Sequence, residues 1–237
     1  FEGDIDARMV RTRARPVPAG RVQAADAAAL GVVLSLFSVA VMGLATNWLA
    51  AALLAFTIFF YAVVYTRWLK RRTPQNIVVG GLAGALPPAV GWAAATGAAP
   101  LNAWLLVAII FVWTPPHFWA LSLLTKDDYA AAGVPMLPVV KGGRHTRRQI
   151  LIYSVALFGL ALAPAFTGLG GALYLAAAII GGMAFVFLAI QLDRRTDGED
   201  AAAARRLFKV SILYLFALFA ALLVEHVGGI GPFGRLI

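Results

Sequence analysis

The sequence of 237 residues contains no cysteine and few charged side chains. Without cysteine, disulfide bonds and thiolate metal sites are excluded. Charged residues make up 13% of the chain and hydrophobic residues 61%, whereas soluble domains carry about 25% charged residues. No low-complexity tract and no independent soluble domain is visible. The composition therefore favours a membrane protein.

Charge is almost absent from seven apolar stretches, which run over residues 25–46, 48–67, 77–96, 103–123, 150–168, 171–190 and 209–227. Each is close to the roughly 20 residues that a helix needs to cross a bilayer. Lipid offers backbone polar groups no water, and the stretches lack period-2 alternation. We therefore predict an all-α, polytopic membrane helical bundle.

The positive charges occupy every second gap between these stretches. Nineteen of the 20 Lys and Arg residues fall within 8–21, 67–72, 126–148 and 194–209, and the gaps near 47, 97–102 and 169–170 contain none. The positive-inside rule places all four groups in the cytoplasm. Every Asp and Glu except Glu225 shares that side, and residues 193–209 are expected to extend the last helix there. Since topology explains the net charge of +9, we do not expect nucleic acid as a partner.

The segment before the first stretch combines acids with arginines. Glu2 and Asp6 share a face if the segment is helical, whereas Asp4 projects elsewhere. Arg11 and Arg15 follow. Carboxylate oxygens suit Mg²⁺ and guanidinium groups suit phosphate oxygens. The pattern predicts a metal-bound phosphate site; the alternative is a salt-bridged helix at the membrane surface.

A second acidic segment follows the fourth stretch. Asp127, Asp128 and Tyr129 are flanked by Lys126 and Lys141. Two acidic and basic loops on one membrane face predict the mouth of a shared cavity. One or two Mg²⁺ ions could bind a diphosphate there. The attraction between each close pair of opposite charges would be about 4 kcal/mol.

His117 is a rare ionisable residue within a stretch. In the functional interpretation it faces an internal cavity, in which Trp113, Phe118 and Trp119 enclose a flat substrate. In the alternative it bonds a carbonyl freed by Pro115 and Pro116. The pair at 87–88 is likewise expected to break the third stretch.

Four segments, Asp4–Pro16, Tyr65–Gly81, Pro115–Leu121 and Lys126–Lys141, carry a family resemblance over essentially the whole chain. In this order they resemble the protohaem IX farnesyltransferases (haem O synthases), a branch of the UbiA superfamily of intramembrane prenyltransferases. The third and fourth segments are specific to that branch. The resemblance implies a nine-helix bundle around a central cavity, with acidic motifs after helices two and six. The chain would then be a single domain, 1–237, without the first two helices, and the asparagine of the first motif would lie upstream of Phe1.

The resemblance also implies the reaction: the farnesyl group of farnesyl diphosphate joins the 2-vinyl group of haem B to give haem O. Its implied catalytic residues are Asp6, Asp128 and His117. Mg²⁺ would be held by Glu2, Asp6, Asp127 and Asp128. The diphosphate would be bound by Arg11, Arg15, Lys126, Lys141 and Tyr129. The haem would be positioned by His117, Trp113 and Trp119.

Three alternatives stay open. Another UbiA-type aromatic prenyltransferase, of a quinone or chlorophyll pathway, is disfavoured by the segment Pro115–Trp119. A transporter is disfavoured because mid-membrane charges are lacking, and a non-catalytic assembly factor because it needs no paired acidic motifs. Under the favoured interpretation the protein lies in a bacterial inner membrane with its active-site loops in the cytoplasm. A haem A synthase or an oxidase assembly protein is then a candidate partner.

Overall fold

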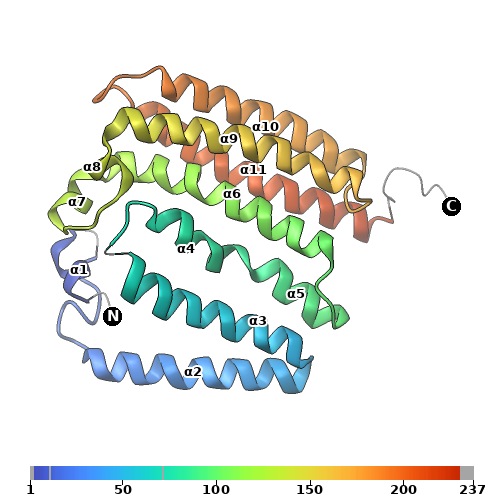
Figure 1. Cartoon of the computed structure of the whole chain (residues 1–237), viewed down its shortest axis with the longest axis horizontal. Helices are drawn as coiled ribbons and strands as arrows, with labels where there is room; N and C mark the ends of the chain where they lie inside the picture. Colours follow the sequence, from blue (N-terminus) through green and yellow to red (C-terminus); the bar gives the residue numbers. More distant parts are fainter. Residues whose placement is uncertain (1–2, 11, 71, 230–237) are drawn as a thin grey trace. The chain divides into compact units, whose positions relative to one another are not determined.

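A computed structural model describes residues 3–10, 12–70 and 72–229, and within them every regular element is a helix (Figure 1). Seven helical segments are long and apolar enough to cross a membrane: Ala24–Ala45, Trp48–Leu69, Asn76–Thr96, Leu101–Leu124, Gly142–Phe166, Ala172–Asp193 and Ala201–Val227. They correspond one for one to the predicted stretches. The all-α, multi-pass membrane fold is therefore confirmed.

Two helices begin more than one turn before their apolar stretches. Helix α9 (Gly142–Phe166) starts before residue 150, and α11 (Ala201–Val227) starts before residue 209. The expected extension of the last helix is thus found from Ala201 on, whereas residues 194–200 form turns and loop. The additional turns carry basic residues such as Arg147 and Arg206. A helix satisfies its backbone groups in water as well as in lipid, so the limits of hydrophobicity do not set the limits of the helix.

The chain forms two compact units. The first comprises Phe1–Ala99 and Thr125–Val140. Within it α2 (Ala24–Ala45) packs against α3 (Trp48–Phe59), and α3 packs against α5 (Pro87–Thr96). The short helices α1 (Gly3–Arg8) and α7 (Lys126–Ala131) lie at the same end of this unit, where α4 (Asn76–Ala85) begins (Figure 1). Helix α8 (Leu137–Val140) packs against α7.

The third span is broken at its prolines, as predicted. Helix α4 ends at Ala85 and α5 begins at Pro87. Proline is favoured in the first turn of a helix, where its missing N–H has no partner to lose. The pair at 87–88 therefore divides one crossing into two helices.

The second span contains a π-helix that the sequence analysis treated as regular α-helix. This segment, η1 (Phe60–Leu69), follows α3 directly. Its wider turn is seen where the Thr66 hydroxyl donates to the carbonyl of Tyr61 at 2.8 Å. The Tyr65 ring lies against Gly80 of α4, so closely that a Cβ at residue 80 would overlap the ring. Glycine thus permits η1 and α4 to pack. Extended π-helical segments are rare and frequently occur at functional sites.

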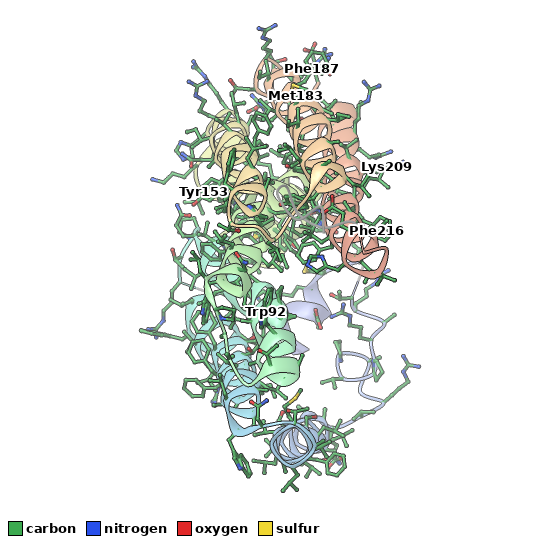
Figure 2. All side chains as sticks on the ribbon, turned by 90° about the vertical axis from the view of Figure 1, so that its right-hand side faces the viewer. Trp92, Tyr153, Met183, Phe187, Lys209 and Phe216 are labelled. Atoms are coloured by element: carbon green, nitrogen blue, oxygen red, sulfur yellow. The ribbon has the colours of Figure 1, made fainter. Side chains whose placement is uncertain are left out.

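The second unit comprises Pro100–Leu124 and Lys141–Ile237. Helix α6 (Leu101–Leu124) packs against α9 and α11, and α10 (Ala172–Asp193) also packs against both. Apolar side chains such as Met183, Phe187 and Phe216 point outward from these helices (Figure 2). Exposed apolar side chains suit a surface surrounded by lipid.

Buried charges in the second unit are paired. The Arg147 guanidinium, 3% exposed, donates to Asp197 at 2.6 Å and to Asp200 at 2.8 Å. Glu225 of α11 is buried and accepts hydrogen bonds from the backbone of Gly171 at 2.7 Å and Tyr174 at 3.0 Å. Glu225, the exception to the charge pattern, therefore caps the first turn of α10, where a carboxylate is favoured.

The contact between Gly80 and Tyr65 leads to a stability prediction. Gly80→Ala should lower the stability by about 1–3 kcal/mol, because the added methyl displaces the Tyr65 ring. The matched control is Gly84→Ala on the same helix, where a Cβ meets nothing within 4 Å. Alanine favours a helix over glycine by about 1 kcal/mol, so this control should be stabilised. Thermal unfolding in detergent would measure both, and an equal shift in the two variants would contradict the packing.

Candidate functional site

Helix α1 carries Asp6 in a fixed position. Ile5 and Met9, on one face of this segment, are buried. The Thr12 hydroxyl donates to the backbone carbonyl of Asp6 at 2.9 Å. The Asp6 carboxylate forms an ion pair with Arg15 at 3.1 Å. The structure thus brings together a predicted metal ligand and a predicted phosphate ligand.

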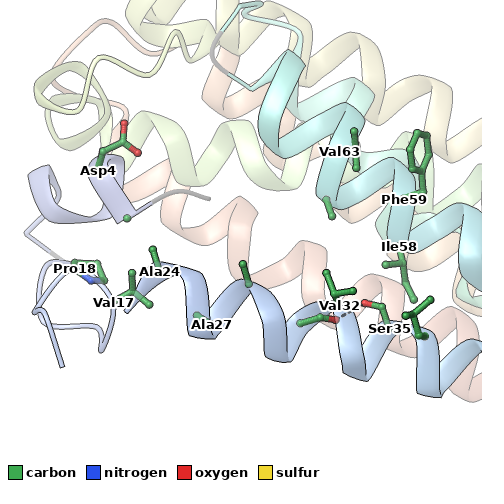
Figure 3. A pocket seen from close by; sticks show the side chains of 15 residues that line it. Asp4, Val17, Pro18, Ala24, Ala27, Val32, Ser35, Ile58, Phe59 and Val63 are labelled. Atoms are coloured by element: carbon green, nitrogen blue, oxygen red, sulfur yellow. Dashed lines mark hydrogen bonds between the residues drawn. The ribbon is translucent and has the colours of Figure 1, made fainter. Parts of the chain in front are cut away.

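Two adjoining pockets begin at α1. The larger has a volume of about 830 Å³ and is mostly apolar (Figure 3). It lies between α2 and the α3–η1 helix, and its walls include Ala24, Ala28, Val32, Leu36, Ile58 and Phe59. The smaller, of about 300 Å³, includes Asp6, Tyr61 and Thr66. The two share the residues Gly3, Val17, Pro18 and Ala62. The smaller pocket, which contains Asp6, has the more polar lining of the two, so we call it the polar pocket and the larger one the apolar pocket.

Three residues of these pockets were missed or set aside by the sequence analysis. Asp4 was set aside, yet it lies at one end of the apolar pocket (Figure 3). Tyr61 and Thr66 line the polar pocket from η1. Their five-residue spacing places them together only in a π-helix, so no pattern based on regular α-helix could find them. The sequence offered no signal for Asp4, because a two-residue separation turns its side chain away from Asp6 on a helix.

The second acidic segment is a short helix rather than the predicted loop. In α7, Asp127 is exposed and Asp128 half-buried, and both lie in the first turn. Lys126 is exposed and Tyr129 half-buried. Carboxylates are favoured at this end of a helix, which explains why the segment is helical. Because α7 lies at the same end of the first unit as α1 (Figure 1), the two acidic motifs share one end of that unit.

Two predicted ligands, Glu2 and Arg11, lie outside the described residues. Among the residues that are described, no three His, Asp or Glu side chains gather as a metal site. Mg²⁺ does not require such a group, because it usually binds through one or two carboxylates together with water and substrate phosphates. The oxygen donors of Asp6, Asp127 and Asp128 therefore fit Mg²⁺ chemically.

His117 belongs to the second unit, where three aromatic rings and one hydroxyl contact its imidazole. Its ring stacks on Trp113 at 4.2 Å between centroids and on Phe208 at 4.5 Å, with Phe118 edge-on at 5.0 Å. Its Nδ1 lies 2.6 Å from the Ser211 hydroxyl of α11. Within the described chain its partner is thus a hydroxyl, not a carbonyl freed by the prolines.

Trp119 does not share this arrangement. It is completely buried and meets Tyr153 of α9 edge-on at 5.4 Å. Residues two positions apart differ by about 200° around a helix. Trp119 therefore faces away from His117, whereas Trp113, four residues earlier, shares its face. The three predicted haem-positioning residues do not form one wall.

Lys141, a further predicted diphosphate ligand, belongs to the second unit. It is exposed and directly precedes α9, in the second unit. Arg15, Lys126 and Tyr129 belong to the first unit. The family resemblance grouped these four residues with Arg11, and three of the four belong to the first unit.

Known proteins similar to this chain were found in sequence and in structure. Residues 1–229 match the UbiA prenyltransferase family. A Protoheme IX farnesyltransferase of Caulobacter sp. (strain K31) is 63% identical over 97% of this chain and 74% of its own length. A protein of the same name from Parvibaculum lavamentivorans is 58% identical over 98% of this chain and 73% of its own length.

One similar solved structure comes from a study of digeranylgeranylglyceryl phosphate synthase. Its TM-score is 0.77, and the match covers 96% of this chain and 78% of the solved chain. At 17% sequence identity this likeness shows a common fold and nothing about the substrate.

The pair of Asp6 and Arg15 leads to a prediction about cation binding. Arg15→Gln removes the competitor for the carboxylate, so Mn²⁺ used as a probe should bind up to about fivefold more tightly, given roughly 0.2–1 kcal/mol for such a pair. Arg21→Gln is the control, because Arg21 donates to the backbone carbonyl of Ala14 instead. Mn²⁺ titration by electron paramagnetic resonance, without diphosphate, would measure this. Equal affinities in the two variants would argue against Asp6 as a ligand.

Proposed function

We propose that this chain, which belongs to the UbiA prenyltransferase family, transfers the farnesyl group of farnesyl diphosphate to the 2-vinyl group of haem B and thus makes haem O. One observation carries the proposal. Eight relatives named Protoheme IX farnesyltransferase are 55–63% identical to this chain over at least 95% of its length.

The pockets of the first unit support the binding of a prenyl diphosphate. The apolar pocket between α2 and the α3–η1 helix suits a C15 hydrocarbon chain, and its volume of about 830 Å³ is within the usual range for ligand sites. The polar pocket, with Asp6, adjoins it. A ligand with a charged head and an apolar tail matches this change of polarity.

Mg²⁺ is the proposed cofactor, with Asp6, Asp127, Asp128 and Glu2 as its ligands. Bound there, it would neutralise the diphosphate and stabilise it as a leaving group. The Arg15 guanidinium, 55% exposed in its pair with Asp6, can turn to phosphate oxygens. Lys126, Tyr129, Lys141 and Arg11 are proposed to add further contacts to the diphosphate.

The remaining chemistry depends on exclusion of water and on orientation. When the bond between the farnesyl carbon and the diphosphate oxygen breaks, an allylic cation forms, and an apolar pocket delays its capture by water. The vinyl group of the haem supplies electrons to this cation. Water then adds to the resulting cation beside the ring and loses a proton. His117 and Trp113 position the haem, and Trp119 holds α6 against α9 from the opposite side.

The membrane location is proposed in more detail. The basic groups that follow alternate spans favour a cytoplasmic position for the acidic motifs. The similar proteins include those of Caulobacter strains, which supports a bacterial inner membrane. A haem A synthase or an oxidase assembly protein is proposed as a partner that receives the haem O.

The activity can be tested with the purified chain in lipid vesicles. Incubation with haem B, farnesyl diphosphate and Mg²⁺ should yield a haem whose mass has increased by one farnesyl group and one hydroxyl group. Prenylation of 4-hydroxybenzoate with haem B unchanged would instead indicate a quinone-pathway enzyme. Uptake of an anionic solute without release of diphosphate would indicate a transporter.

Asp128→Asn tests the second acidic motif. The substitution removes a negative charge without changing the shape, so turnover should fall by about a hundredfold or more, as when one stabilising group is lost from an active site. Asp26→Asn is the matched control, because Asp26 lies exposed in the first turn of α2 and outside the proposed site. Haem O formation and thermal unfolding would be measured for both. Equal turnover in the two variants would remove Asp128 from the metal site.

A further inference from the structure

The hydrogen bonds around Ser211 determine which nitrogen of His117 carries the proton. Ser211 has one hydroxyl proton, and its Oγ lies 2.6 Å from the backbone carbonyl of Phe208 and 2.6 Å from His117 Nδ1. A carbonyl oxygen can only accept a hydrogen bond. The hydroxyl must therefore donate to Phe208, and Nδ1–H of His117 must donate to Ser211. Neutral His117 then has its lone pair on Nε2.

The environment fixes the direction of this lone pair. Trp113 and Phe208 stack on the two faces of the ring, at interplanar angles of 18° and 22°. The Trp113 indole donates to the backbone carbonyl of Ser211 at 2.8 Å, which ties α6 to α11 at this level. His117 is 8% exposed, and Nε2 has no hydrogen-bond partner among the described residues. A buried imidazole thus keeps one nitrogen available for a ligand.

This arrangement matches the way proteins prepare a histidine to bind a metal. A metal-binding histidine almost always donates its other N–H to a fixed acceptor, which sets the tautomer and makes the binding nitrogen more basic. Ser211 is such an acceptor for Nδ1–H. Iron is a metal that imidazole binds well, and haem offers iron at the centre of a flat ring.

We propose that His117 binds the iron of the haem substrate through Nε2, and that Ser211 is a positioning residue that sets the tautomer. The inference rests on the proposed function, because it takes haem as the acceptor. Iron coordination would fix the position of the haem relative to α6, and stacking of Trp113 and Phe208 would keep the imidazole from rotating.

The test uses the purified chain with haem B and no farnesyl diphosphate. Optical and resonance Raman spectra should show a histidine-bound iron. His117→Ala should lose this signature and bind haem at least tenfold more weakly, and added imidazole should restore the signature. Farnesyl diphosphate should bind this variant as it binds the unchanged protein. His145→Ala and His226→Ala, at two exposed positions, should leave the spectra unchanged.

Ser211→Ala separates tautomer control from simple packing. Haem should still bind, but the iron–histidine stretching band should move to lower frequency, because Nδ1–H loses its acceptor. Ser154→Ala is the control, because Ser154 is also buried and its hydroxyl donates to the carbonyl of Ile150 at 2.7 Å. An unchanged band in Ser211→Ala would refute the role of Ser211.

Other outcomes separate the inference from the proposed function. If haem is farnesylated while His117→Ala keeps the histidine signature, iron coordination by His117 is wrong and the activity stands. If the unchanged protein neither binds nor farnesylates haem, the proposed function fails, and the inference fails with it.

Discussion

Hydrocarbon neither hydrates a charge nor bonds a free amide, and each such group left in it costs several kcal/mol. The helices satisfy the backbone, so the penalty falls on the few polar side chains within the spans. Glu225 avoids this cost by accepting hydrogen bonds from two backbone amides, and Ser154 avoids it by donating a hydrogen bond to a carbonyl of its own helix. His117 avoids this cost at Nδ1, which hydrogen-bonds to the Ser211 hydroxyl of α11. Its Nε2 is not among the fully buried polar atoms of the described residues that lack a partner, so this nitrogen stays accessible to a ligand.

The same constraint explains why the candidate site of the first unit joins two unlike pockets. An acid without hydrogen-bond donors is costly in the interior of the bilayer, and Asp6 and Asp128 occupy the short helices at one end of the unit. The groove between α2 and the α3–η1 helix can be apolar along its length because lipid and prenyl chains have the same polarity. The π-helix connects the two, since its wider turn places Tyr61 and Thr66 beside Asp6. An amphipathic substrate thus finds its two environments along one surface.

The seven spans could be predicted because each charged residue in lipid is costly by itself, whatever its neighbours are. A stretch almost without charge is therefore visible in the sequence alone. The break at Pro87 could be predicted for a similar reason, since proline acts locally. Contacts between distant residues could not. Ser211 is 94 residues from His117, and nothing in its own neighbourhood indicates a partner. Trp119 was grouped with His117 because they are neighbours in sequence, but the helical twist turns them to opposite sides of α6. Tyr61 was missed because the pattern assumed regular α-helical turns, whereas Phe60–Leu69 form a π-helix.

Two arginines that pair with aspartates show why a basic motif alone cannot identify a phosphate ligand. Arg147 is 3% exposed and bridges Asp197, which is 66% exposed, and Asp200, which is 13% exposed. For a buried pair such as Arg147 and Asp200, removing one partner typically costs about 3–5 kcal/mol. Arg15 is 55% exposed and has Asp6 at 3.1 Å, and pairs of this kind contribute about 0.2–1 kcal/mol. A diphosphate can therefore take the guanidinium of Arg15 at little cost, whereas taking that of Arg147 would open the connection between α10 and α11. Both residues lie in arginine-rich segments: Arg15 precedes the span Ala24–Ala45, and Arg147 lies near the start of the helix Gly142–Phe166. Burial, which the sequence does not state, decides which of them is available to a substrate.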